Sequence, residues 1–98
     1  MFVLNRTNIN DAVEECRRIP GAILLDVREA DEYRSGHIPG AVSVPLSTIE
    51  TTTLPKNKRL YVYCLRGTRS RRAIRILRRK GYDAKSIGGF AAYKGELE

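Results

Sequence analysis

Short apolar runs alternate with amphipathic stretches along this chain of 98 residues. Runs rich in apolar and β-branched residues predict strands at residues 2–3, 22–26, 41–44, 60–63 and 83–87. The intervening amphipathic or capped stretches predict helices at residues 8–18, 28–35, 70–80 and 90–94. Strands that alternate with helices are typical of a parallel sheet covered on both faces. We therefore expect an α/β fold and a single domain spanning residues 1–98.

The most informative stretch is residues 61–70, where a predicted strand ends in Cys64 and a helix begins near Ser70. A tight loop between a strand and a helix can point successive backbone N–H groups at an anion. Cys64 stands at the start of this loop, near those N–H groups, the positive end of the helix dipole and two guanidinium groups. Each of these favours the thiolate, which is the nucleophilic form. We therefore interpret Cys64 as a nucleophile rather than as a structural cysteine.

Asp26 also stands at the end of a predicted strand. Ligands of parallel sheets bind outside the carboxyl ends of the strands, so we expect Asp26 and Cys64 at the same edge. We interpret Asp26 as a group that supports the loop by accepting hydrogen bonds. Arg28, Asp31 and Glu32 could act as acids or bases, but we favour an ion pair or a cap that stabilises the short helix.

The positive charge is unevenly distributed. The net charge is +7, and eight of the 18 basic residues lie between positions 66 and 80. The predicted helix at residues 70–80 has no interleaved aromatic residues that could stack on bases. The pattern is typical of a solvated helix face, and an acidic protein or an anionic persulfide carrier fits its charge at least as well as nucleic acid does. With one histidine and two cysteines, no Cys/His cluster indicates a metal site.

Cys16 differs from Cys64 in its surroundings. It completes an apolar stripe with Ile9, Ala12 and Val13 at helical spacing, which predicts a core cysteine; a resolving thiol is the alternative. The apolar runs are too short for a membrane span, and the first residues are too short for the hydrophobic region of a signal peptide. These features predict a cytoplasmic protein without membrane contact.

Several motifs together resemble the single-domain rhodanese family. They are Leu25-Asp26-Val27-Arg28-Glu29, Glu32-Tyr33, Gly36-His37-Ile38-Pro39-Gly40-Ala41, Cys64 to Ser70 and Ile87-Gly88-Gly89. The resemblance covers nearly the whole chain and implies a rhodanese-like fold of about five parallel strands with helices on both faces. It also implies a sulfurtransferase that needs no metal or organic cofactor. In such an enzyme the cysteine takes a sulfane sulfur from thiosulfate or a low-molecular-weight persulfide. It then passes the sulfur to a thiol, cyanide or a thioredoxin-like protein.

The resemblance assigns roles to the residues around the loop. The expected site comprises Cys64 as nucleophile, Leu65, Arg66, Gly67, Thr68 and Arg69 as the anion-binding loop, and Asp26, Arg28 and Ser70 as supporting residues. The N–H groups of residues 65–69 should surround the sulfur, while Arg66 and Arg69 hold the oxyanion end of the donor. Many active members carry a basic or polar residue at the position of Leu65, which leaves the donor preference open. Tyr93 replaces a tryptophan common in the family, and we expect this to affect packing only.

Other functions fit parts of the pattern. Cysteine phosphatases, including those of this fold, resemble the pattern Cys-x5-Arg, whereas Cys64 and Arg69 form Cys-x4-Arg. The shorter loop fits one sulfur atom better than a tetrahedral phosphate. Binding modules of this fold usually lack the cysteine, which is present here. The alternative is a sulfur relay without turnover, or a protein- or RNA-binding module that uses the basic helix at residues 70–80.

Overall fold

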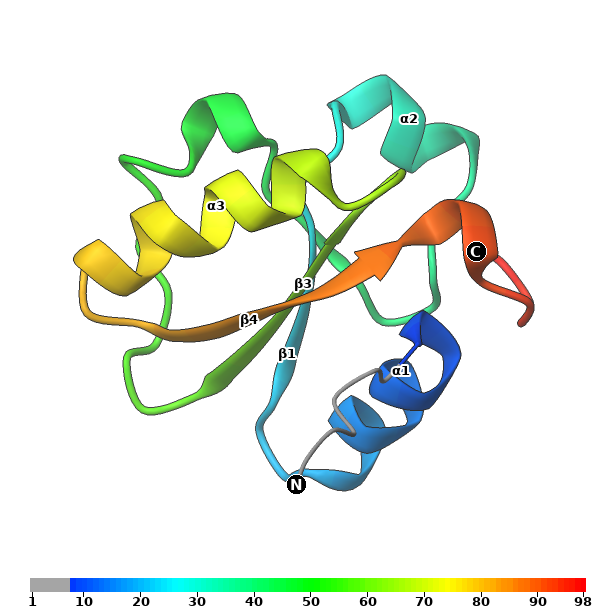
Figure 1. Ribbon diagram of the computed structural model, residues 1–98, viewed down its shortest axis with the longest axis horizontal. Helices are drawn as coiled ribbons and strands as arrows, with labels where there is room; N and C mark the ends of the chain where they lie inside the picture. Colours follow the sequence, from blue (N-terminus) through cyan, green and yellow to red (C-terminus); the bar gives the residue numbers. More distant parts are fainter. Residues whose placement is uncertain (1–7) are drawn as a thin grey trace.

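Helices and strands alternate in the computed structural model, which describes residues 8–98 (Figure 1). The strands are β1 (Ile23–Asp26), β2 (Val42–Ser43), β3 (Arg59–Cys64) and β4 (Asp83–Gly89). The α-helices are α1 (Ile9–Arg18), α2 (Ala30–Ser35) and α3 (Thr68–Arg79). Two short 3-10 turns are η2 (Leu46–Thr48) and η3 (Phe90–Ala92).

The sheet is parallel, with the strand order β2-β1-β3-β4. Four strands are present within residues 8–98, and the fifth, predicted at residues 2–3, lies outside the described residues. Asp26 is in register with Tyr63, and Cys64 is in register with Gly89. The carboxyl ends of β1, β3 and β4 therefore meet at one edge of the sheet, as the sequence predicts for Asp26 and Cys64.

Two apolar cores lie on opposite faces of the sheet, because side chains alternate along β3. Val62 and Cys64 pack in the core that includes Leu77 of α3. Tyr61 and Tyr63 pack in the other core, which includes the apolar face of α1. Figure 1 shows α1 on one side of the sheet and α3 on the other. The predicted α/β fold with helices on both faces is confirmed.

Two helices begin at residues other than the predicted ones. Helix α2 begins at Ala30 and not at residue 28, because the backbone N–H of Arg28 donates to Oδ1 of Asp26 (2.9 Å). Helix α3 begins at Thr68, before the predicted start at residue 70. Gly67 precedes it with a φ of 102°, a left-handed conformation that favours glycine. The loop between β3 and α3 is therefore only three residues long, residues 65–67.

The start of α1 agrees with the prediction, whereas the segment after β4 differs from it. The side-chain oxygen of Asn8 accepts the N–H of Asp11 at 3.0 Å, which is a regular N-cap. Strand β4 continues to Gly89, and the helix predicted at residues 90–94 is a 3-10 turn. None of the helices within residues 8–98 has the length and apolar character that a membrane span requires.

Candidate active site at Cys64

The loop after β3 is pressed against the end of β4. Gly89 lies so close to it that an added Cβ would collide with the carbonyl oxygen of Leu65. That same oxygen accepts the backbone N–H of Ala91 (3.0 Å). The Gly-Gly pair of the sequence motif therefore has a physical role at Gly89, because only a residue without a side chain allows the loop to reach this position.

Two backbone N–H groups donate to the sulfur of Cys64. The N–H of Gly67 lies 2.9 Å from Sγ and that of Ser70 lies 3.3 Å from it. Burial raises the pKa of the thiol, but hydrogen bonds from Ser70, Gly67 and Arg66 more than offset this effect. The pKa of Cys64 is therefore below its ordinary value. The arrangement stabilises a thiolate at the end of β3.

Ser70 has a more direct role than the sequence suggested. We expected it to support a ring of N–H groups from residues 65–69, whereas its own N–H contacts the sulfur. Its hydroxyl donates to the carbonyl oxygen of Gly67 (3.0 Å) and lies 2.7 Å from Oγ of Ser86 on β4. Ser86 was not predicted as a site residue, and no local pattern marks it. These bonds hold the first turn of α3 against both the loop and the sheet.

Arg69 is held by an ion pair between α3 and α2. Its guanidinium donates to both carboxylate oxygens of Glu32, at 2.7 and 3.1 Å. The hydrogen bond from Arg69 is the main reason why the pKa of Glu32 falls to about 2, although burial opposes the shift. Glu32 also accepts the N–H of Glu29 (2.8 Å), at the start of α2. Glu32 thus fills both predicted roles, ion pair and cap, and Arg69 is the ion-pair partner that the sequence did not reveal; Arg28 forms a separate ion pair, with Asp26.

Asp26 and Arg28 form a buried ion pair. Nε and Nη2 of Arg28 donate to the carboxylate of Asp26, with a shortest distance of 2.7 Å. The hydroxyl of Tyr63 also donates to this carboxylate (2.8 Å), and Nη2 of Arg28 donates to the carbonyl oxygen of Gly36 (2.8 Å). Asp26 thus accepts N–H and guanidinium hydrogen bonds as predicted, but their donors belong to Arg28 and not to the 64–70 loop. Among the described residues, its partners connect the ends of β1 and β3 to the turn after α2.

A small pocket lies above the sulfur. It has a volume of about 180 Å³, and it is lined by Cys64, Leu65, Arg66, Thr68 and Arg69. The structure thus brings Cys64 together with four of the five predicted loop residues, while the N–H of Gly67 donates to the sulfur. Arg66 and Thr68 are exposed, and Leu65 is half-buried. The pocket therefore offers an apolar wall beside two guanidinium groups.

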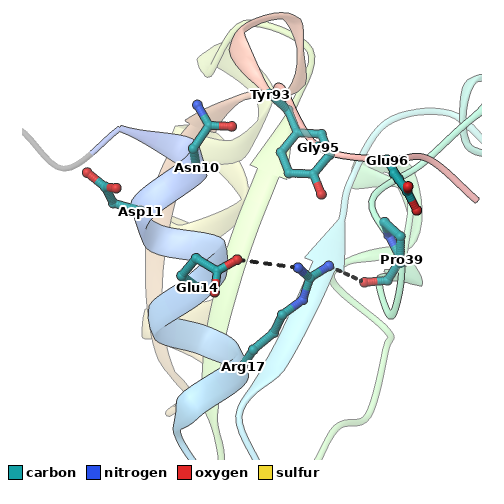
Figure 2. A pocket seen from close by; sticks show the side chains of 8 residues that line it. All are labelled: Asn10, Asp11, Glu14, Arg17, Pro39, Tyr93, Gly95 and Glu96. Atoms are coloured by element: carbon teal, nitrogen blue, oxygen red, sulfur yellow. Dashed lines mark hydrogen bonds and ion pairs between the residues drawn. The ribbon is translucent and has the colours of Figure 1, made fainter.

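A larger hollow of about 620 Å³ lies between α1 and residues 93–96 (Figure 2). Arg17 crosses it, pairing with Glu14 (3.7 Å) and donating to the carbonyl oxygen of Pro39 (3.1 Å). Its lining includes no cysteine, serine or histidine. Cys64 lines the smaller pocket, so volume alone does not identify the candidate site.

Cys16 and His37 lie apart from this chemistry. Cys16 is buried in the core beside α1, on the opposite face of the sheet from Cys64, and burial raises its pKa. This placement confirms a core cysteine and argues against a resolving thiol. The ring of His37 stacks on Tyr33 at 3.7 Å. Within residues 8–98, no three His, Cys, Asp or Glu side chains gather as metal ligands do.

Comparison with known proteins identifies the family. A family model described as "Rhodanese-like domain" matches residues 9–96. The chain belongs to the rhodanese-like domain family. The resemblance inferred from the sequence motifs is therefore confirmed.

Individual rhodanese-like proteins are similar over most of the chain. A "tRNA sulfurtransferase" of Desulfurococcus amylolyticus is 41% identical over 87 residues, which are 87% of this chain and 18% of that protein. The "Thiosulfate sulfurtransferase PspE" of Escherichia coli is 37% identical over 70 residues, which are 66% of this chain and 67% of that protein. This chain thus spans less than a fifth of the first relative.

A solved structure shows the same fold. The protein SSP1007 of Staphylococcus saprophyticus superposes with a TM-score of 0.83 at 26% identity. The match covers 93% of this chain and 95% of that chain.

Proposed function

We propose that this protein is a sulfurtransferase that moves a sulfane sulfur from an anionic donor, through a persulfide on Cys64, to a thiophilic acceptor. The observation that carries the proposal is the sulfur of Cys64, which accepts two N–H groups at the floor of an open pocket. The names of two relatives, a tRNA sulfurtransferase and a thiosulfate sulfurtransferase, support sulfur transfer as the class of reaction.

The reaction has two displacement steps at sulfur. With thiosulfate, the Cys64 thiolate attacks the outer sulfur, the S–S bond breaks, and sulfite leaves with the electron pair. The cysteine then carries the persulfide. In the second step a thiolate or cyanide attacks the terminal sulfur, and the Cys64 thiolate leaves. The N–H groups of Gly67 and Ser70 stabilise the anion at Sγ before the first step and after the second.

Arg66 and Arg69 contribute to donor binding in different ways. Arg66 is exposed at the pocket, and its guanidinium can reach the oxyanion end of the donor. Arg69 is anchored by Glu32, so it adds a positive wall whose position is held by α2. Leu65 supplies the apolar side of the pocket.

Intact-mass spectrometry after incubation with thiosulfate tests the proposal. Covalent capture should add one sulfur atom, roughly 32 Da, and a cyanide chase should remove it. Cys64→Ala should abolish the adduct. Cys16→Ala is the matched control, because it removes the other thiol from the opposite core and should leave the adduct intact. An adduct that persists in Cys64→Ala, or that is lost equally in both variants, would contradict the assignment.

A further inference from the structure

A second pocket lies beside the one that contains Cys64. It has a volume of about 320 Å³ and is lined by Glu29, Leu46, Ser47, Arg69, Arg72 and Ile76. Arg69 lines both pockets. Arg69, Arg72 and Ile76 are spaced three and four residues apart on α3, so they follow one another along the same side of the helix. This side of α3 leads from the reactive sulfur into the second pocket.

The second pocket has four kinds of binding group. Leu46 and Ile76 are half-buried apolar side chains, and Ser47 adds a hydroxyl. Glu29, at the start of α2, adds an exposed carboxylate. Arg72 adds an exposed guanidinium. A pocket lined by apolar side chains, a cation and an anion is complementary to a small zwitterion, that is, a molecule with one ammonium and one carboxylate group.

Arg72 is open to a ligand, unlike the basic residues near the end of α3. Arg79 pairs with Glu50 (2.7 Å), and Arg78 donates to the carbonyl oxygen of Ala84 (2.8 Å). Arg72, by contrast, has no side-chain hydrogen bond or ion pair to any residue within 8–98. Since Arg69 is also bound, to Glu32, Arg72 is the lining cation of this pocket that can accept a carboxylate without breaking an existing pair.

We propose that the second pocket binds the non-reacting end of an amino-acid persulfide, R–S–SH, in which R carries an α-ammonium and an α-carboxylate group. Arg72 binds the carboxylate, Glu29 binds the ammonium group, and the terminal sulfur reaches Cys64. Thiosulfate is a single compact anion, which the smaller pocket accommodates and which leaves the second pocket unused. This inference rests on the proposed function, because the same Cys64 receives the sulfur.

The transfer step is balanced without any further reactant. The Cys64 thiolate attacks the terminal sulfur of R–S–SH, and a new S–S bond forms. The old S–S bond breaks, and R–S⁻ leaves with the electron pair while the proton stays on the transferred sulfur. The leaving thiolate departs close to Arg69, whose positive charge is held in place by Glu32.

Steady-state kinetics of the full chain with three donors test this inference. The donors are cysteine persulfide, the persulfide of 2-mercaptoethanol and thiosulfate. The second donor has the same reactive group as cysteine persulfide but lacks the ammonium and carboxylate groups. Arg72→Gln should raise KM for cysteine persulfide about tenfold, which is the loss of one carboxylate–guanidinium interaction. It should leave the other two donors within about twofold of the parent. Arg75→Gln is the matched control, because it removes one exposed charge from the same helix outside the pocket lining.

The outcomes separate this inference from the function on which it rests. Equal losses for all three donors, in both variants, would indicate general attraction of anions and would overturn the pocket assignment. An unchanged KM for cysteine persulfide in Arg72→Gln would also overturn it, while transfer from thiosulfate would leave the proposed function standing. A parent protein that takes sulfur from none of the donors would refute both.

Discussion

The buried ion pair of Asp26 and Arg28 allows a sharp test of what holds the site's edge of the sheet together. Asp26→Asn keeps the shape of the side chain and one acceptor oxygen but removes the negative charge. Asp26 is 0% exposed and Arg28 is 4% exposed, so water cannot replace the lost charge. We therefore expect a large loss of unfolding free energy from this single change.

The magnitude follows from the partners that Arg28 retains. Removal of one member of a buried ion pair usually costs about 3–5 kcal/mol. In the variant, Arg28 still donates to Gly36, and its Cζ lies 4.1 Å from the centre of the Phe90 ring. These contacts offset part of the loss, which places the expected cost at about 3 kcal/mol. For a domain of this size that cost lowers Tm by about 12–24 °C.

Urea unfolding followed by circular dichroism measures this effect, and the chain contains a matched control. Asp83 pairs with Arg59 at 3.2 Å, but these side chains are 66% and 49% exposed. Asp83→Asn makes the same chemical change at the surface, and it should leave the unfolding free energy within experimental error. An unchanged slope of free energy against urea would show that the denatured state is unaffected. The reasoning would be refuted by a loss in Asp26→Asn no larger than that in Asp83→Asn.

Three further predictions follow from the titrating groups and the thiols. The free energy of unfolding, measured with urea, should fall as pH drops from about 4.5 towards 2, because the Glu32 carboxyl takes up a proton at a higher pH in the unfolded chain than in the folded one. Glu32→Gln should flatten the dependence of this free energy on pH in that range. An unchanged pH dependence in Glu32→Gln would contradict the Arg69 pairing. The rate of iodoacetamide alkylation at Cys64 should rise with pH, with a midpoint below that of free cysteine. Ser70→Ala keeps the backbone N–H but removes the hydroxyl, which also lowers the pKa of Cys64, so the midpoint should move upwards; a profile identical to the parent's would count against this role of the hydroxyl. Cys16→Ala should cost about 1 kcal/mol of unfolding free energy, the usual cost of removing one buried methyl-sized group, and should leave alkylation of Cys64 unchanged.

The sequence by itself predicted the architecture, because the relevant signals are local. The alternation of apolar runs and amphipathic stretches is a property of neighbouring residues, and it predicted β1, β3, β4, α1 and α3 to within a few residues. The position of Cys64, between a buried strand and a helix, is also a local feature, and its hydrogen bonds to Gly67 and Ser70 span at most six residues. The strand predicted at residues 2–3 and the cytoplasmic location stay predictions.

The tertiary structure decided which side chains meet across the sheet edge. Arg69 lies 37 residues from Glu32, and Tyr63 lies the same distance from Asp26, so no spacing pattern could pair them. We expected Asp26 to contact the loop because its strand ends beside that of Cys64, yet its carboxylate accepts hydrogen bonds from the guanidinium of Arg28.

The second pocket is likewise formed only by the tertiary structure. It joins Glu29, the N-cap of α2, to residues of η2 and α3, which lie far apart in the sequence. Periodicity determines which face of an element is buried, and so the sequence was sufficient for the fold and for the position of Cys64 at the end of a buried strand. The contacts between charged side chains depend on how the ends of separate elements are packed against each other, and only the folded chain supplies that information.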